Sequence, residues 1–275
     1  MLTGMSEVPL GQILDESDRR EVRPPTPRPG PATLRRDAWW LQPAATALLL
    51  FLFVVYSSWA AFVNANYYSA PYLSPFYSPC LAASCGEHAN WALFGTWWPF
   101  SPAIIILIFP LAFRLTCYYY RKAYYRSFWL SPPACAVAEP HRRYTGETRF
   151  PLILQNVHRY AFYFAVPIAA ILTVDAVEAF HFPDGWGMGL GSAIFVVNAI
   201  LIWLYTLSCH SCRHLCGGRL NVFSEHRFRY WLWRKLSPLN AQHMKFAWAS
   251  LVWVACTDAY VRLLATGTIH DPRFF

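Results

Sequence analysis

The segment CHSCRHLC at residues 209–216 is the densest group of soft metal-binding side chains in the sequence. It holds three cysteines and two histidines, and it directly follows an apolar run. Thiolates and imidazoles together are the donors that zinc and iron–sulfur centres prefer. This segment therefore predicts a metal site at the point where an apolar helix meets water.

Other donors stand at the ends of other apolar segments. Cys117 ends one such segment, His158 lies one to two turns inside the next, and His243 precedes the last. An ionisable side chain inside a membrane helix is costly and usually functional, so His158 supports a site at this depth. If the helix before Cys209 continued through residue 216, its cysteines would share one face and its histidines another. The Gly217–Gly218 pair predicts that this helix stops there.

Three kinds of metal centre are compatible with these donors. Zinc held by CHSCRHLC alone would explain this segment. It would not explain why His158, in another helix, lies at the same depth in the membrane. A haem b needs two histidines on facing helices, and His158 with His210, His214 or His243 would supply one pair. A Rieske-type two-iron, two-sulfur centre takes two Cys and two His. Because both kinds of ligand fall at one depth, we favour the Rieske-type centre and keep one haem b as the alternative.

The elements that carry these donors are predicted to be membrane helices. The chain of 275 residues is 56% hydrophobic and 18% aromatic, which is unusually apolar for a soluble domain. About 20 apolar residues cross the hydrocarbon core, and five windows qualify: 44–64, 97–117, 152–174, 190–208 and 244–265. We therefore predict an all-α integral membrane bundle of five transmembrane helices over residues 41–275, preceded by a Pro-rich arm over residues 1–40.

The basic residues alternate from one connecting segment to the next. Lys and Arg gather before the first span, between the second and third, and between the fourth and fifth, whereas 65–96 and 175–189 contain none. Positive residues stay on the cytoplasmic side, which predicts a cytoplasmic N-terminus and a C-terminus outside. The net charge of +8 follows this alternation, so we expect no nucleic-acid partner.

The predicted outer side carries two cysteines in the motif CLAASC. If that side is oxidising, Cys80 and Cys85 can form a disulfide. Two free thiols in a turn of small residues are the alternative.

A second pair of residues lies toward the outer side of the last span. Asp258 and Arg262 are four residues apart, which predicts an ion pair along the helix. The alternative is a proton relay through Asp175, Glu178 and Asp258, because intramembrane acids often carry protons.

The segment RLTCYYYRKAYYRSFW, at residues 114–129, combines cations with aromatic side chains at the predicted inner interface. An aromatic belt and the positive-inside bias account for much of it. A quinone also needs apolar walls and donors for its carbonyl oxygens, and the candidates here are Tyr118, Tyr119, Arg121 and Trp129.

Several long blocks resemble a known family. They are TCYYYRKAYYRSFW (116–129), YTGETRFPLILQNVHRYAFYFA (144–165), SCHSCRHLCGGRL (208–220) and LNAQHMKFAWASLVWVACTDAYVRLLA (239–265). In this order they resemble the membrane-anchor subunit of actinobacterial succinate dehydrogenase, respiratory complex II. The resemblance covers about residues 115–265.

The resemblance implies a subunit of the bacterial cell membrane that crosses it several times and serves an enzyme complex. Such a subunit holds a flavoprotein (FAD) subunit and an iron–sulfur subunit at the inner membrane face and passes electrons from succinate to a quinone, here menaquinone. The segments HRRYTGETR and FRYWLWRK are expected to contact the iron–sulfur subunit.

Many anchors of this kind hold haem b through histidines, but the first span here has no His. That departure leaves room for an iron–sulfur centre. The preferred ligand set takes one residue from each of the later spans, Cys117, His158, Cys209 and His243, with His210, Cys212 and His214 in reserve.

Overall fold

The computed structural model describes residues 35–82, 85, 95, 97–140, 151–218 and 220–275. Within these residues the chain is mainly helical. The helices are α1 (Leu41–Val63), α2 (Ala103–Ile106), α3 (Ile108–Thr116), α4 (Tyr118–Phe128), α5 (Pro151–Glu178), α6 (Leu190–Leu207), α7 (His210–Gly217), α8 (Arg227–Ala241) and α9 (His243–Ala265). Two short antiparallel hairpins pair β1 (Tyr68–Ser69) with β2 (Tyr72–Leu73), and β3 (His181–Phe182) with β4 (Gly185–Trp186).

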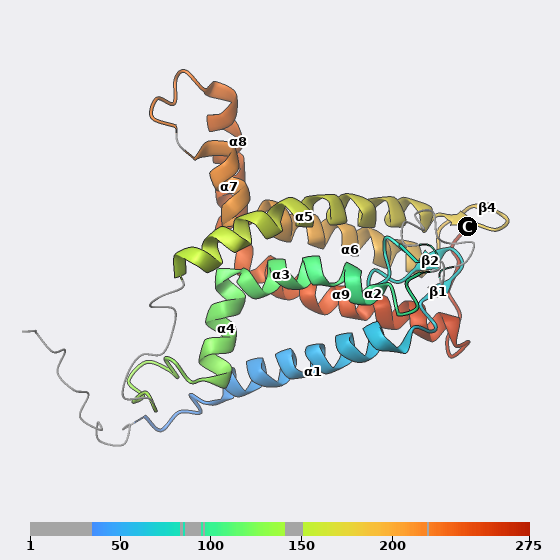
Figure 1. The fold of residues 1–275 in the computed structure, drawn as a ribbon, viewed down its shortest axis with the longest axis horizontal. Helices are drawn as coiled ribbons and strands as arrows, with labels where there is room; N and C mark the ends of the chain where they lie inside the picture. The colour runs from blue at the N-terminus through green and yellow to red at the C-terminus, as the bar shows by residue number, and fades with distance from the viewer. Residues whose placement is uncertain (1–34, 83–84, 86–94, 96, 141–150, 219) are drawn as a thin grey trace, which may run out of the picture.

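The long helices form one bundle, which Figure 1 shows lying on its side. α6 packs against α5 and α9, α3 packs against α5, and α1 contacts α9 and α4. Both hairpins lie at one end of the bundle, which we call the hairpin end. At the opposite end α4, α7 and α8 turn away from the bundle axis, and we call this the arm end.

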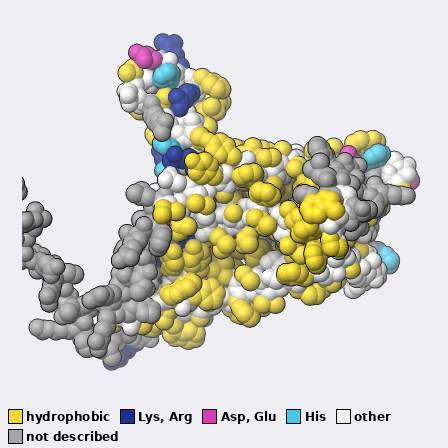
Figure 2. Space-filling view, in the orientation of Figure 1, with side chains coloured by type: hydrophobic (Ala, Val, Ile, Leu, Met, Phe, Trp, Pro, Cys, Tyr) yellow, Lys and Arg dark blue, Asp and Glu magenta, His cyan; other side chains and the backbone are white. Residues whose placement is uncertain are grey.

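The surface of the bundle is apolar, as a membrane protein requires. Phe51 and Phe62 of α1 and Tyr160 of α5 are more than half exposed, and hydrophobic side chains cover the flank seen in Figure 2. Such a contiguous exposed apolar surface is abnormal for a water-soluble monomer but is expected next to lipid. The bundle is therefore the membrane-embedded part of the protein.

The described residues contain three helices that are long and apolar enough to cross a membrane, α1, α5 and α6. The pair formed by α2–α3 and α4 qualifies as a fourth only if its 76° bend belongs to one broken span. α9 has 23 residues but is not among these candidates, because it carries Lys245, Asp258 and Arg262. The sequence prediction of five spans is thus supported for three or four helices.

The span predicted at 97–117 differs from the observed structure at its start. Its helical part begins at Ala103, after Pro102, and Pro99 and Pro102 limit the helix because proline lacks the backbone N–H that helices need. The predicted end at Cys117 agrees with the structure, since α3 ends at Thr116. The remaining predicted spans overlap α1, α5, α6 and α9 closely.

A buried ion pair fastens the hairpin end. The Asp258 carboxylate accepts hydrogen bonds from Arg262 Nε at 2.8 Å, from Tyr56 Oη at 2.5 Å and from Ser74. Arg262 also donates to the carbonyl of Ala65 at 2.7 Å. The predicted ion pair is confirmed, and it connects α9 to α1 and to the segment after it.

The proton relay through Asp175, Glu178 and Asp258 stays a prediction. Glu178 itself is exposed and lies 3.8 Å from the His181 imidazole.

A second carboxylate holds the C-terminal segment against β2, α6 and α9. Asp271 accepts hydrogen bonds from Tyr72 Oη and Tyr260 Oη, each at 2.5 Å, and from the backbone N–H of Gly191 at 2.8 Å. Burial, followed by the hydrogen bond to Asp271, raises the pKa of Tyr72. Cys80 and Cys85 are joined in a disulfide at the same end.

Candidate metal centre

Two cysteines lie at the breaks where helices leave the bundle. Cys117 joins α3 to α4 with an extended backbone (φ −64°, ψ 131°), and Cys209 joins α6 to α7 in nearly the same conformation (φ −60°, ψ 140°). The break thus comes at Cys209 and not at Gly217, so the helix of span four does not continue through residue 216. Each cysteine is the N-cap of the helix that turns away, which leaves its thiol in the bundle.

The structure pairs each of these thiols with an imidazole from another helix. Cys117 Sγ lies 3.5 Å from Nε2 of His243, and Cys209 Sγ lies 3.1 Å from Nε2 of His158. All four side chains are buried, none more than 8% exposed. Four donors from four different helical segments thus meet at the arm end of the bundle.

Hydroxyl groups fix both imidazole rings. Thr116 donates its hydrogen to a carbonyl one turn earlier at 2.7 Å, so its oxygen is left to accept the Nδ1–H of His158 at 2.9 Å. Ser208 likewise donates to a carbonyl of α6 at 3.1 Å and accepts from Nδ1 of His243 at 2.7 Å. Each ring therefore turns an unprotonated Nε2 toward a thiol, and this is the nitrogen that a metal would bind.

The two halves of the site support each other reciprocally. Thr116 precedes Cys117 but orients His158, which faces the other cysteine. Ser208 precedes Cys209 but orients His243, which faces Cys117. This crossing fixes α3, α5, α6 and α9 relative to one another around the four donors.

An aromatic ring stacks on the face of each imidazole. Phe113 stacks on His158 with ring centroids 4.7 Å apart, and Tyr205 stacks on His243 at 5.1 Å. Because both imidazoles are packed as well as hydrogen-bonded, their Nε2 atoms are preorganised for a ligand.

All four donors line one cavity of about 350 Å³. Tyr118, Tyr119 and Arg121 line it as well, so three of the four predicted quinone residues lie beside the predicted metal ligands. Trp129 does not line this cavity and packs instead against Tyr124 and Tyr125.

The reserve ligands divide into two groups. His210 and His214 line the same cavity, whereas Cys212 does not and is buried in the apolar cluster with Leu236. Burial, together with neighbouring Cys216, raises the pKa of the Cys212 thiol to about 12. Cys212 is therefore the least suitable of the predicted ligands.

The donors are arranged as two pairs rather than as a ready-made cage. Among the described residues, no three His, Cys, Asp or Glu side chains are grouped as one metal site. Two thiols and two imidazoles are nonetheless the ligand set of a Rieske-type centre. The donor chemistry fits that group, and its binding here stays a prediction.

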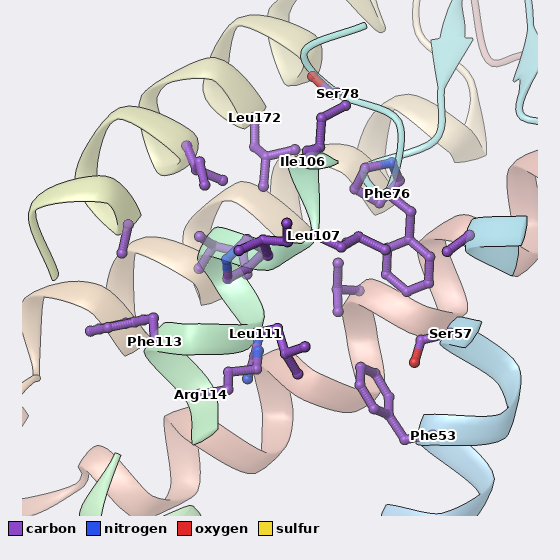
Figure 3. Close-up of a pocket in the computed structure, with 18 of the residues that line it drawn as sticks. Phe53, Ser57, Phe76, Ser78, Ile106, Leu107, Leu111, Phe113, Arg114 and Leu172 are labelled. Carbon is purple, nitrogen blue, oxygen red and sulfur yellow. The ribbon is translucent and has the colours of Figure 1, made fainter. Parts of the chain in front are cut away.

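A second, mainly apolar cavity lies next to this site, farther from the arm end. It measures about 270 Å³ and is lined by Phe53, Phe76, Leu107 and Leu172, among others, with Arg114 on one side (Figure 3). Phe113 and Tyr205, which stack on the two imidazoles, also line it. This cavity could not be predicted from the sequence, because its walls come from segments far apart in the chain.

Sequence reasoning also missed the two hydroxyl residues that orient the imidazoles. A signal was present, since a hydroxyl residue directly precedes each of the two cysteines, as Thr116–Cys117 and as Ser208–Cys209. Asn240 also supports Ser208, because its side-chain amide donates to the Ser208 carbonyl at 2.8 Å.

Fold and site together define a helical membrane subunit with thiol and imidazole donors at one end. Residues 41–267 match the family described as actinobacterial succinate dehydrogenase subunit SdhC, and the chain belongs to that family.

The chain is also similar to a chain of a solved structure, the Mycobacterium smegmatis Sdh1 complex in the apo form. The sequences are 55% identical, the match covers 91% of this chain and 97% of that one, and the TM-score is 0.81. No curated protein matches the chain.

Proposed function

We propose that this chain is the membrane anchor of a succinate:quinone oxidoreductase and carries electrons from succinate to menaquinone through a Rieske-type iron–sulfur centre. Family membership supports the enzyme complex. The observation that carries the electron-transfer role is the reciprocal pairing of Cys117 with His243 and of Cys209 with His158.

The proposed orientation puts the arm end in the cytoplasm. The described basic residues gather at that end, on α4, α7 and α8, whereas Arg262 and Arg273 at the hairpin end are each paired with an aspartate. The positive-inside bias then predicts that the flavoprotein and iron–sulfur subunits dock at the arm end. In this arrangement α9 crosses the membrane as a fifth span, with its charges neutralised inside the protein.

Each residue of the site has a distinct role in this proposal. Cys117, Cys209, His158 and His243 would hold the centre, and Thr116 and Ser208 keep the imidazoles in the ligating tautomer. When bound, a two-iron, two-sulfur group supplies one-electron transfer. The stacked rings of Phe113 and Tyr205 hold the two imidazoles in place.

The quinone headgroup is expected in the part of the same cavity that Tyr118, Tyr119 and Arg121 line. Arg121 is buried and donates through Nε to the Thr116 carbonyl at 3.1 Å, which holds its guanidinium at the cavity wall. A guanidinium there can donate to a quinone carbonyl oxygen, and Tyr118 and Tyr119 supply aromatic walls. The apolar cavity that shares Phe113 and Tyr205 offers room for an isoprenoid tail.

The test compares Cys209→Ser with Cys212→Ser in the assembled complex. Both cysteines are buried and three residues apart, but only Cys209 faces an imidazole and lines the cavity. We expect Cys209→Ser to remove iron and acid-labile sulfide from the membrane subunit and to abolish succinate–quinone turnover. Dye reduction by the soluble subunits should survive, and Cys212→Ser should behave as wild type. Equal iron and sulfide in the two variants would contradict the proposed centre.

A single haem b held by His158 and His243 is the second candidate. Its support is that both imidazoles turn Nε2, the usual axial donor, into one site from α5 and α9. Sharp reduced-haem bands in the visible spectrum of the purified complex would favour it. Zinc without iron or sulfide would instead favour a zinc-binding membrane scaffold.

A further inference from the structure

A helical arm projects sideways from the arm end of the bundle (Figure 1). It consists of α7, Gly218, the segment 220–226 and α8, and its two helices pack on each other. The guanidinium of Arg213 lies 4.5 Å from the ring centroid of Trp233 and donates to Ser237 Oγ at 3.0 Å. Arg229 donates to the carbonyl of Cys216 at 3.1 Å. The facing sides of α7 and α8 are therefore occupied by their own contacts.

The opposite face of α8 carries two large exposed aromatic side chains. Phe228 is 70% exposed and Trp231 is 52% exposed, and their rings are stacked with centroids 6.1 Å apart. Two such rings side by side on a helix in water would lose the stabilisation of burial. Their exposure indicates that this face is covered in the membrane-bound protein.

Cations flank the aromatic pair on the same face. Arg227, Arg234 and Lys235 are exposed, and none of them forms a salt bridge with a described residue. Glu225 is the single acidic residue between residues 210 and 241. The face therefore presents an uncompensated positive charge around an apolar centre, the pattern of helices that lie in a membrane interface.

The direction of the arm fits that location. α7 begins where the membrane helix α6 ends, and the arm runs across the bundle axis. A membrane that surrounds the bundle would therefore have this arm lying along its surface. Hydrophobic side chains gather on the side of the arm that faces the apolar flank of the bundle (Figure 2).

A cavity of about 310 Å³ lies at the base of the arm. It is lined by Arg159 and Tyr163 of α5 and by His214, Leu215, Gly218 and Arg229 of the arm. Tyr163 is half exposed on the lipid-facing side of α5. The cavity thus brings the Arg159 guanidinium next to a lipid-facing residue, while Arg229 is already hydrogen-bonded to the carbonyls of Cys216 and Gly218.

We propose that the arm is a membrane-surface anchor, with Phe228 and Trp231 inserted among phospholipids and Arg227, Arg234 and Lys235 bound to anionic headgroups. The inference does not depend on which metal the centre holds. This assignment replaces the expectation that FRYWLWRK (228–235) contacts the iron–sulfur subunit. Lipid, rather than a second protein, occupies the exposed face of α8, because the charge and the direction of that face both match a membrane surface.

The test is photo-crosslinking in the assembled complex within its native membrane. Trp231→benzoylphenylalanine is compared with Trp186→benzoylphenylalanine, because Trp186 is 70% exposed but lies on β4 at the hairpin end. We expect at least about tenfold more phospholipid adduct at position 231 than at position 186. Adducts at position 231 to another polypeptide, or lipid adducts no more frequent than at position 186, would overturn the proposal.

A charge variant tests the headgroup preference separately. In a background with the crosslinker at position 231, the triple change Arg227→Gln, Arg234→Gln and Lys235→Gln should lower the ratio of anionic to zwitterionic adducts at least about tenfold. These side chains are exposed, so the fold should be retained, and dye reduction by the soluble subunits serves as the control. An unchanged ratio would remove the anionic part of the proposal.

Discussion

The two ends of the bundle both bury polar side chains, but they satisfy them differently. At the hairpin end, the Asp258 carboxylate and the Arg262 guanidinium each have several hydrogen-bond partners from the protein itself. At the arm end, each imidazole uses one nitrogen on a hydroxyl and turns the other toward a thiol. The difference lies in the kind of partner: a carboxylate paired with a guanidinium favours a structural role, whereas thiols facing imidazole nitrogens are the donors that zinc and iron–sulfur centres take, which favours a ligand site.

The largest expected effect tests the arm end. Cys117→Ser should abolish succinate–quinone turnover, because Cys117 is one of only two buried thiols that face an imidazole among the described residues. Cys256→Ser is a matched control, since Cys256 lies in α9 but is exposed. Turnover and iron content of both variants give the measurement, and a Cys117→Ser complex with full iron and full turnover would remove the distinction between the two ends.

The next effect tests the hairpin end. Asp258→Asn leaves the buried Arg262 guanidinium uncompensated, which should cost about 3–5 kcal/mol of stability. Thermal denaturation of the complex in detergent measures the loss, while the iron content per folded complex stays at the wild-type level.

The double variant Asp258→Asn/Arg262→Met sharpens this test. Replacing a whole buried ion pair is often close to neutral, so most of the lost stability should return. If the double variant were as unstable as Asp258→Asn, or if Asp258→Asn lost iron, the hairpin end would have more than a structural role.

A smaller effect is expected from the hydroxyl residues that orient the imidazoles. Thr116→Val and Ser208→Ala each remove the acceptor for one Nδ1–H, and outer-shell changes of this kind lower metal affinity about 10–100-fold. Thr116→Ser retains a hydroxyl and should restore the affinity. Chelator titration of iron, followed by electron paramagnetic resonance, compares the three variants, and equal affinity in all of them would contradict the orienting role.

The smallest effect concerns Tyr72, which donates to Asp271 in the C-terminal segment. Tyr72→Phe should cost about 1 kcal/mol, the usual net contribution of a hydrogen bond. Burial raises the pKa of Tyr72 above its ordinary value of 10.0, so the folded state holds this proton more tightly than the unfolded state. Its contribution is therefore complete below pH 10 and decreases as the pH rises further.

Stability measured against pH between 8 and 11 tests this assignment. The decrease above pH 10 should be shallower in Tyr72→Phe than in wild type. Identical profiles would show that the Tyr72 proton is not linked to folding.

Much of the bundle could be predicted from sequence, because the length of an apolar segment is a local property. The ends of α6 and α9 and the break at Cys117 agree with the predicted boundaries to within a residue or two. The start of α3 and the number of spans were less predictable. Prolines shorten the second span, and the charges of α9 lower its apolar character although they are paired inside the bundle.

The sequence indicated which side chains share the cavity, but not how they are arranged, and their role as ligands stays a prediction. One-sided placement of cysteines and histidines identified the four donors that share a cavity. Their pairing depends on the break at Cys209 and on which imidazole each hydroxyl reaches, and both are set by helix packing. The apolar cavity near Phe113 and the network around Asp258 likewise join segments up to 202 residues apart, for which a single sequence contains no signal.

The two helix breaks have a mechanical consequence. Each cysteine lies at the point about which the following helix would tilt. α4, with 11 residues, extends about 16 Å from Cys117. When a helix tilts about one end, its far end moves most. A tilt of α4 that displaces Phe128 by several ångströms therefore leaves Cys117 nearly still. The far ends of α4 and α7 can adjust to the surfaces that they contact, while the sulfur atoms keep their distances to the imidazoles.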